Sequence, residues 1–348
     1  MRFLLTDEQR EFAQALDGML SASGTPAVAR AWAAGDHQPG RTLWTRIAGA
    51  GVFELGVPEK HGGSGLLPVE LTLSFEELGR HAVPGPLVET VAAAVFLEQL
   101  GADAEAGEWL PRIASGGAVL SLCAGAGPYA PDADAADPTY ALDANGPARY
   151  ALDADAADAV LVIQGDTVSR TDTHGPVQSS LDPARRLARP LDGTVLARGP
   201  AVTAAAAHAT EVARLLTAAQ SLGLGRALLA ATVSYVRQRT QFRVPIGSFQ
   251  AVKHRLADTL IGLEFARPLV HAAALALAAG APSAGREVAA AKVAAGEAGY
   301  AAARTALQLH GAIGYTEELD LSLWIRKARP LRDAWGTPAD CRARVLTR

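Results

Sequence analysis

The sequence predicts a mainly α-helical protein in which a small β domain separates an N-terminal helical domain from a C-terminal four-helix bundle. Three observations lead to this fold class. Apolar residues recur at helical spacing through the first third of the chain, short strand patterns replace them after residue 117, and the helical period returns beyond residue 200. We therefore expect three domains, at residues 1–117, 118–200 and 201–348.

The first third contains helix patterns separated by turns rich in glycine and proline. A helix is predicted over residues 6–20, because Thr6 or Asp7 can cap it and apolar residues follow at four-residue spacing. Turn residues gather at 62–65 and 84–86. Further helix patterns cover residues 43–50, 68–78 and 89–100.

The middle third indicates strands joined by turns. Short apolar runs are typical of buried strands, and the connections between them are rich in Asp, Ala, Gly and Pro and show almost no helical period. The strand patterns cover residues 118–122, 159–163 and 194–196.

The last third predicts long helices. An apolar stripe runs along the first of them, and the abundant alanine allows helices to approach closely. Because the connections are short, these helices are expected to form an antiparallel bundle. The predicted helices cover residues 204–240, 248–279, 284–310 and 319–335.

Composition excludes several classes of protein. Lys and Arg number 32 against 36 Asp and Glu and are spread along the chain, which argues against nucleic-acid binding. Cys123 and Cys341 have no second thiol or histidine at ligand spacing, which excludes a zinc knuckle and fits a reducing compartment. The N-terminus has no signal-peptide pattern, and His271 interrupts an apolar run shorter than the roughly 20 residues that span a bilayer. We expect a soluble cytoplasmic protein.

Three segments resemble motifs of the acyl-CoA dehydrogenase family. Residues 57–65 followed by 76–80 resemble its N-terminal domain. Residues 239–250 resemble its R-x-x-F-G-x-x-I-x-x-F-Q stretch, and residues 308–315 resemble its Q-x-x-G-G-x-G-Y/F. The resemblance covers nearly the whole chain, and the predicted order of domains is also that of the family.

The resemblance implies a flavin adenine dinucleotide (FAD) held between subunits. By position, the residues that would contact one flavin are Arg239, Phe242 and Gln250. Those that would contact another, in a neighbouring subunit, are Gln308, Gly311 and Thr337. Arginine suits phosphate, and glycine lets the backbone approach a dinucleotide. The alternative for Arg239 is a solvated charge at a helix end.

The sequence departs from the family at the catalytic base. In that family a Glu carboxylate removes the α proton of an acyl thioester while the flavin accepts the β hydride. At the commoner position of this Glu the chain has Trp335, and at the other position it has Ala213. Neither side chain accepts a proton, so the resemblance implies that a partner subunit supplies the base.

Other residues near these positions are weaker candidates. Glu211 lies about 200° around the helix from Ala213, so we expect it to face solvent rather than replace the base. Arg214 matches an arginine beside the active site of relatives and is either functional or structural. Cys123 and His310 lack a base-orienting partner, and Cys123 is interpreted as a small core residue.

Aromatic and acidic groups near the C-terminus have simple structural interpretations. Trp324 and Trp335 are more typical of packing residues than of cofactor platforms. Acidic residues at the start of a helix are favoured by its dipole, which explains Glu317, Glu318 and Asp320 without a paired-carboxylate site.

The expected flavin contacts are also fewer than in the family. Residues 122–128 lack the family's isoalloxazine-contacting motif, and Arg243 and Ala312 replace two family glycines. A self-contained flavin site is therefore not expected.

Three hypotheses about the function follow. The first is a base-less acyl-CoA dehydrogenase subunit in a homo- or hetero-oligomer with a second such subunit, like the shortened subunits of heteromeric steroid side-chain enzymes, whose C-terminal motif residues 335–344 resemble. The alternative is a repurposed fold that lacks flavin and serves as a cofactor-independent enzyme or binding protein in secondary metabolism. A homomeric dehydrogenase using another carboxylate, such as Glu211 or Glu318, is a third interpretation.

Overall fold

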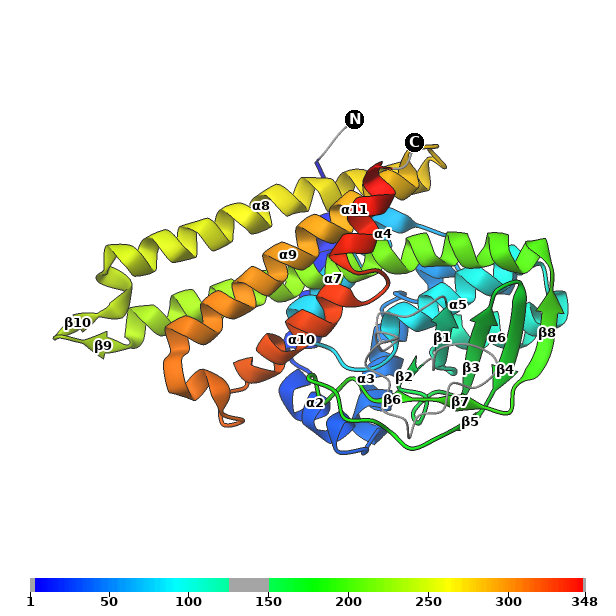
Figure 1. The fold of residues 1–348 in the computed structure, drawn as a ribbon, viewed down its shortest axis with the longest axis horizontal. Helices are drawn as coiled ribbons and strands as arrows, with labels where there is room; N and C mark the ends of the chain where they lie inside the picture. Colours follow the sequence, from blue (N-terminus) through cyan, green and yellow to red (C-terminus); the bar gives the residue numbers. More distant parts are fainter. Residues whose placement is uncertain (1–3, 125–149, 347–348) are drawn as a thin grey trace. The chain divides into compact units, whose positions relative to one another are not determined.

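The computed structural model describes residues 4–124 and 150–346 and confirms the predicted fold class (Figure 1). Helices dominate both ends of the chain, and the strands gather in the middle. Contacts between residues group the chain into two compact units. The first comprises Met1–Ala29, Pro68–Val83 and Arg214–Arg348, and the second comprises Arg30–Leu67 and Pro84–Ala213. The predicted domain limits at residues 117 and 200 stay a prediction.

The first of the N-terminal helices, α1, begins with a capping box. The Thr6 hydroxyl accepts from the Gln9 backbone N–H, and the Gln9 side chain accepts from the Thr6 N–H, so two N–H groups at the start of α1 are satisfied. Two of the helices, α2 and α6, were not predicted, because α2 is only nine residues long and α6 contains Pro111. The helices are α1 (Asp7–Ser21), α2 (Thr25–Ala33), α3 (Gln38–Gly49), α4 (Pro68–Arg80), α5 (Leu87–Leu100) and α6 (Asp103–Ala114).

Four of the strands in the second unit form a sheet with the order β1-β3-β4-β8, while β2 pairs with β6 and β5 pairs with β7. β1 and β3 are parallel, whereas β4 is antiparallel to both of its neighbours. β3 is buried along all but its last residue, which explains its continuous apolar sequence. The strands are β1 (Leu120–Ala124), β2 (Ala151–Leu152), β3 (Ala159–Gln164), β4 (Thr167–Thr171), β5 (Thr173–His174), β6 (Leu187–Ala188), β7 (Pro190–Leu191) and β8 (Thr194–Arg198).

A buried carboxyl group fixes the turn that follows β2. Asp153 has a positive φ of 52° and accepts hydrogen bonds from Trp32 Nε1 at 3.2 Å and from the Arg186 N–H at 3.1 Å. Burial raises the pKa of Asp153 to about 7. The strained backbone of this residue is therefore held by packing and by two donors.

The C-terminal bundle is built from long antiparallel helices. Thr259 on α8 donates to Thr305 on α9 at 3.2 Å, and Figure 1 shows the two helices running side by side. A short hairpin joins α7 to α8. The elements are α7 (Pro200–Gln238), β9 (Thr240–Gln241), β10 (Val244–Pro245), α8 (Gln250–Ala278), α9 (Ala284–His310), α10 (Leu321–Asp333) and α11 (Pro338–Leu346).

Glycines let α7 touch the backbones of two other helices. A Cβ at Gly223 on α7 would overlap the carbonyl oxygen of Glu76 on α4, and a Cβ at Gly79 would overlap that of Gln220. On another side of α7, a Cβ at Gly299 of α9 would lie 2.6 Å from the Ser221 carbonyl oxygen. Helices at this separation tolerate only hydrogen at these positions.

We predict that Gly223→Ala lowers the free energy of unfolding by about 2 kcal/mol or more, because the added methyl group meets a backbone carbonyl that cannot move aside. Gly18→Ala on α1 is the matched control, since a Cβ there meets nothing within 4 Å and alanine favours helix. Thermal unfolding of both variants checks this. Equal melting temperatures for Gly223→Ala and the wild type would show that the crossing is not tight.

Candidate functional site

The two positions of the family's base hold side chains that cannot take up a proton. Ala213 lies on α7 and is fully buried. Trp335 is half-buried in the turn between α10 and α11, where its φ is +59°, a value unusual for a large side chain. Residues held in this conformation often mark functional positions.

Cationic side chains from two other helices hold the turn that contains Trp335. Arg214 Nε on α7 donates to the Trp335 carbonyl oxygen at 2.9 Å. Lys292 Nζ on α9 donates to the carbonyl oxygens of Leu331 and Arg332, at 3.1 and 2.7 Å, where α10 ends without intrahelical partners for them. Arg214 therefore makes a structural contact here, and Lys292 caps the C-terminus of α10.

Lys292 is a functional candidate that the sequence analysis missed. Its side chain is only 2% exposed, and burial lowers its pKa to about 8. A signal was present in the sequence, because Lys292 interrupts the apolar row that includes Val288, Ala295 and Gly299 on one face of α9. A lysine in such a row brings a charge to the packed face of the helix.

Thr337 lies apart from the other predicted flavin contacts, at the start of α11. Its hydroxyl donates to Asp340 Oδ2 at 2.7 Å, its N–H donates to the same oxygen at 3.0 Å, and the Asp340 N–H donates back to the hydroxyl at 3.2 Å. These bonds cap α11 and leave Thr337 close in sequence to the turn at Trp335.

The other predicted flavin contacts gather at the opposite part of the bundle, around the β9–β10 hairpin. Arg239 and Phe242 lie on this hairpin, and Phe242 is 87% exposed. Arg243, which replaces a family glycine, has a φ of +67°, so the turn keeps the left-handed conformation that glycine favours. Gln250 is exposed at the first residue of α8.

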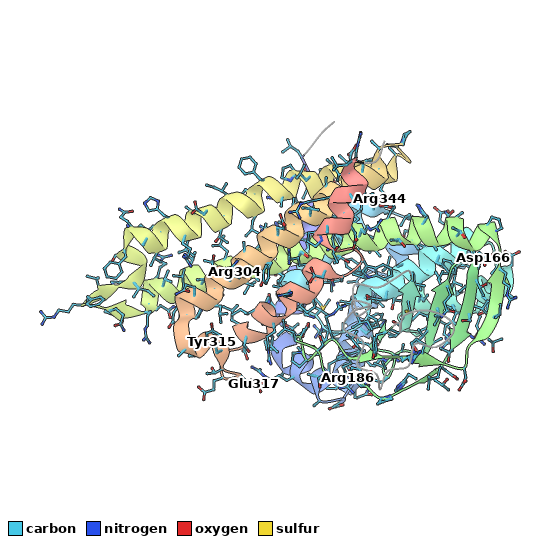
Figure 2. The ribbon with its side chains drawn as sticks, in the orientation of Figure 1. Asp166, Arg186, Arg304, Tyr315, Glu317 and Arg344 are labelled. Atoms are coloured by element: carbon cyan, nitrogen blue, oxygen red, sulfur yellow. The ribbon has the colours of Figure 1, made fainter. Side chains whose placement is uncertain are left out.

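Gln308 lines a pocket of about 400 Å³ between the start of α8 and the end of α9. The other polar lining residues are Arg255, Arg304, Thr305 and Tyr315. Figure 2 shows Arg304 on α9 and Tyr315 in the turn that follows it. Two guanidinium groups beside an amide, with no carboxylate among the lining residues, suit the phosphates of a nucleotide.

The turn after α9 is fixed beside this pocket. Gly311 begins it with a φ of +65°. The His310 ring stacks on Tyr235 of α7 at a centroid distance of 4.1 Å, and Tyr235 Oη donates to the His310 carbonyl oxygen at 3.4 Å. Burial lowers the pKa of His310 and so favours the neutral ring. His310 thus has a packing role, and the end of α7 positions the turn.

Arg255 and Arg304 were also missed by sequence reasoning. Arg304 precedes Gln308 by four residues, so the two side chains share one face of α9, and this spacing was a usable signal. Arg255 has no such signal, because its place in the pocket depends on how α8 packs against α9.

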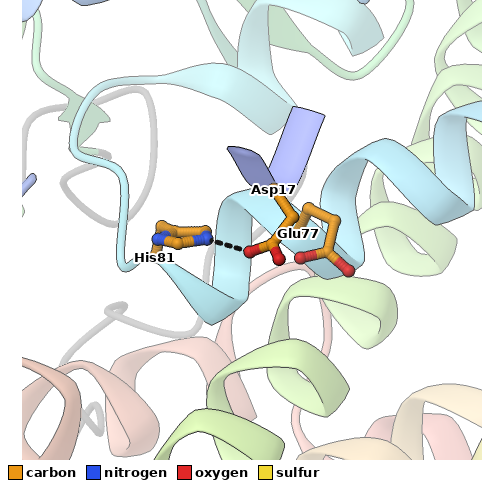
Figure 3. Close-up of side chains that lie close together, drawn as sticks. All are labelled: Asp17, Glu77 and His81. Carbon is orange, nitrogen blue, oxygen red and sulfur yellow. Dashed lines mark hydrogen bonds and ion pairs between the residues drawn. The ribbon is translucent and has the colours of Figure 1, made fainter. Parts of the chain in front are cut away.

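A cluster of potential metal ligands lies between α1 and α4 (Figure 3). His81 Nε2 lies 2.7 Å from Asp17 Oδ1. Arg80 Nη1 lies 3.3 Å from the same oxygen and 3.2 Å from Glu77 Oε2. Because the guanidinium group already supplies positive charge between the two carboxylates, we interpret the cluster as an ion-pair network that joins the helices.

The structure corrects one prediction about acidic residues. Glu211 is buried, so the expectation that it faces solvent was wrong; the residues that follow it, Val212 and Ala213, are buried as well. Glu317 is exposed and pairs with Arg326 at 3.2 Å, while Glu318 is exposed beside it. Asp320 occupies the N-cap position of α10, in keeping with its interpretation as a helix-start residue.

The remaining candidates have packing roles. Cys123 is buried in β1, as expected for a small core residue. Trp324 Nε1 donates to the Arg80 carbonyl oxygen at 2.8 Å, and its ring packs against the core of the bundle. The predicted loss of the isoalloxazine-contacting motif falls largely on residues 125–128, which lie outside the described residues.

Comparison with known proteins identifies the family. Residues 6–117 match the acyl-CoA dehydrogenase N-terminal domain, and residues 203–345 match the acyl-CoA dehydrogenase C-terminal domain. The chain is 31% identical over 326 residues to acyl-CoA dehydrogenase IpdE2 of Mycobacterium tuberculosis, covering 92% of this chain and 91% of IpdE2. The chain belongs to the acyl-CoA dehydrogenase family, whose members are flavoprotein oxidoreductases.

Solved structures agree with this fold. A variant of the Tcur3481–Tcur3483 steroid acyl-CoA dehydrogenase superimposes with a TM-score of 0.81 at 26% identity, covering 97% of this chain and 96% of that chain. A chain of the ChsE4–ChsE5 complex from Mycobacterium tuberculosis superimposes with a TM-score of 0.79 at 24% identity, covering 99% and 98%. Both likenesses extend over the whole fold.

We predict that Lys292 makes stability rise with pH in the alkaline range. Because its pKa is lowered in the folded state from 10.5 to about 8, the unfolded chain holds more protons between these values, and the free energy of unfolding increases across that window. Relative to Lys292→Met, the free energy of unfolding of the wild type should increase by on the order of 3 kcal/mol between pH 7.5 and 10.5.

Urea unfolding of both proteins at several pH values measures this difference. Lys60→Met, at an exposed lysine paired with Glu98, is the control and should run parallel to the wild type. If the free energy of unfolding of Lys292→Met and of the wild type changed with pH in parallel, the lowered pKa of a buried Lys292 would be contradicted.

Proposed function

We propose that this chain is a flavin-binding subunit of an acyl-CoA dehydrogenase, and that a partner subunit supplies the catalytic base for α,β-dehydrogenation of an acyl thioester. The observation that carries the proposal is a contrast between two regions. Both base positions, Ala213 and Trp335, have lost the carboxylate, while the pocket around Gln308 keeps the groups that suit a dinucleotide. A chain that retained only the fold would have no need of that pocket.

The pocket supports binding of FAD through its phosphates and adenine half. Arg255 and Arg304 would neutralise phosphate charge with directed donors, and the Gln308 amide would add a neutral hydrogen bond. Gly311, in the turn that follows α9, would offer an open backbone to this ligand, whereas Arg239 would contact a second flavin, as the family motif implies. When bound, the flavin supplies hydride acceptance.

The relatives support the class of substrate. IpdE2 is an acyl-CoA dehydrogenase, and the Tcur3481–Tcur3483 enzyme is a steroid acyl-CoA dehydrogenase. We propose that this chain takes part in dehydrogenating a steroid-derived acyl thioester. Both of the structural relatives named above carry two different chains in their names, which supports a heteromeric complex here. We also propose that the complex acts in the cytoplasm.

The alternative is a repurposed fold without flavin. It is favoured by the replacement of the base by Trp335 and of two family glycines by Arg243 and Ala312. In this case the indole, half-buried in its turn, would line a binding pocket instead of a redox site. Flavin content separates the two functions.

The location of the base is tested by turnover of the purified complex. The chain is co-expressed with an acyl-CoA dehydrogenase-type chain that carries Glu at either base position and is encoded in the same gene neighbourhood. Replacing that Glu by Gln in the partner should lower kcat by at least a thousandfold, whereas Glu211→Gln and Glu318→Gln in this chain should leave it unchanged. Loss of turnover in Glu211→Gln, with the complex and flavin intact, would place the base in this chain.

We predict that Arg304→Met raises the dissociation constant for FAD at least tenfold in the purified complex, because a phosphate loses a charge-assisted hydrogen bond. Methionine preserves helix propensity and the apolar stem. Arg286→Met, an exposed arginine in the first turn of α9, is the matched control. Flavin retained after desalting measures the effect, and equal retention in both variants would argue against phosphate binding in this pocket.

A further inference from the structure

The connection between α2 and α3, residues 34–37, is held against the turn between β2 and β3 by acidic side chains. Before the connection, Trp32 Nε1 donates to Asp153 Oδ1 at 3.2 Å. After it, Arg41 on α3 donates to both carboxylate oxygens of Asp158, at 3.0 and 3.2 Å. All of these residues belong to the second compact unit. The turn between β2 and β3 therefore binds two consecutive helices through carboxylate groups.

Arg186 completes this attachment from the segment that precedes β6; it is labelled in Figure 2. Its N–H donates to Asp153 Oδ1 at 3.1 Å, and its Nη1 donates at 3.0 Å to the carbonyl oxygen of Ala33, the last residue of α2. Its Nε donates to Asp155 Oδ2 at 2.7 Å. Arg186 thus joins Asp153, Asp155 and the C-terminus of α2.

The carboxyl group of Asp153 is fully buried, and only one of its oxygens is satisfied. Trp32, Ala156 and Ala184 form an apolar cluster at this place. Both donors bind Oδ1, while Oδ2 is buried and has no hydrogen-bond partner among the described residues. An ionised carboxylate would bury a charge with one oxygen that no donor reaches, whereas the neutral acid carries its proton on that oxygen. The surroundings therefore favour the neutral acid.

Burial is the main influence on this carboxyl group. It raises the pKa of Asp153 to about 7, the charge of Glu89 on α5 acts in the same direction, and the two hydrogen bonds and the charge of Arg185 act against it. His37 titrates in the opposite sense, because burial lowers its pKa and its protonation places a cation in the same region. The charged and titratable groups of the neighbouring elements are His37, Arg41, Glu89, Asp155, Asp158, Asp182, Arg185 and Arg186.

We propose that Asp153 is a proton-operated latch: uptake of a proton on Oδ2 fastens the connection between α2 and α3 to the turn between β2 and β3, and release of the proton loosens it. This inference is independent of the proposed function. The ionised carboxylate becomes hydrated only when the turn opens, and Trp32 Nε1 and the Arg186 N–H then lose their common acceptor. Because Arg186 also holds Asp155 and Ala33, opening at Asp153 extends to the end of α2.

The direction of the pH effect follows from the pKa of Asp153 in the closed and open states. In the closed state the group keeps its proton up to about pH 7, whereas in the open, hydrated state it ionises near its ordinary value of 3.8. The closed state therefore binds more protons between these two values. Its stability is greatest in acid and is lost as the pH rises to about 7.

The test compares hydrogen exchange of the backbone amides in residues 31–41 and 151–158 between Asp153→Asn and the wild type, by mass spectrometry from pH 5 to 7.5 with correction for the intrinsic exchange rate. Asparagine keeps an oxygen that can accept from both donors, tolerates the φ of +52° and cannot ionise. We expect the opening constant of the wild type, relative to that of Asp153→Asn, to rise at least tenfold from pH 5 to 7.5. Both proteins contain His37, so its titration cancels in this ratio.

Asp192→Asn is the matched control, because Asp192 also has a positive φ, of 49°, but is exposed. This variant should follow the wild type at every pH. A ratio of wild type to Asp153→Asn that stays constant with pH would overturn the latch. If Asp192→Asn removed the pH dependence to the same extent, Asp153 would not be its source, and the latch would again be overturned.

A second measurement needs no folded variant at Asp153. The chain has five tryptophans, and Trp32 Nε1 donates to Asp153, so one indole N–H resonance should shift with a midpoint near pH 7 when tryptophan is labelled with nitrogen-15. The titration is recorded in His37→Gln, because the His37 ring lies 4.7 Å from that of Trp32 and would shift the same resonance. If no indole resonance titrated between pH 5 and 8, the latch would be overturned.

Discussion

The close approach of α7 to α4 and α9 is the constraint on which the rest of the helical unit depends. Gly223 and Gly79 allow one crossing, and Gly299 allows the other. With α7 fixed in this way, its side chains reach two distant places. Arg214 holds the turn at Trp335, and Tyr235 stacks on His310 beside the pocket at Gln308. α7 thus positions both the turn at Trp335, where the family has its catalytic base, and the turn beside the pocket at Gln308.

The turn at Trp335 and the pocket at Gln308 differ in their chemistry. At the turn after α10, charged donors from Arg214 and Lys292 satisfy backbone carbonyls and hold Trp335 in a strained conformation. The scaffold around the base position therefore persists although the carboxylate is gone. At the pocket, the side chains of Arg255 and Arg304 line a space beside Gln308 that suits the phosphates of a nucleotide. This combination is expected of a subunit that contributes to a shared site.

Much of the fold could be predicted from the sequence because its long elements have strong periods. The helix predicted over residues 284–310 is α9, with the same limits, and the Thr6 cap of α1 is present. Some short elements were not predicted. β4 was missed because its sequence mixes Thr, Ser and Arg and looks like a turn, although pairing with β3 makes it a strand.

The candidate site could be predicted only where a motif carried it. Gln308 came from the resemblance to the family, and the structure places it in one pocket with Arg255 and Arg304, which no motif indicated. Glu211 was wrongly expected to face solvent. The helical angle between two residues gives the direction of a side chain but does not show whether another element packs on that side, and Glu211 is buried. Burial of isolated polar residues is a tertiary property, and periodicity alone does not determine it.

Whether the flavin site is shared between two subunits is tested by the visible absorption spectrum of the chain, purified alone and after co-expression with a base-bearing acyl-CoA dehydrogenase-type chain. We expect flavin bands at stoichiometric intensity in the complex and at much lower intensity in the chain alone, because the chain provides only part of the site. Absence of flavin from both samples, even after incubation with excess FAD and desalting, would contradict it and favour a repurposed fold.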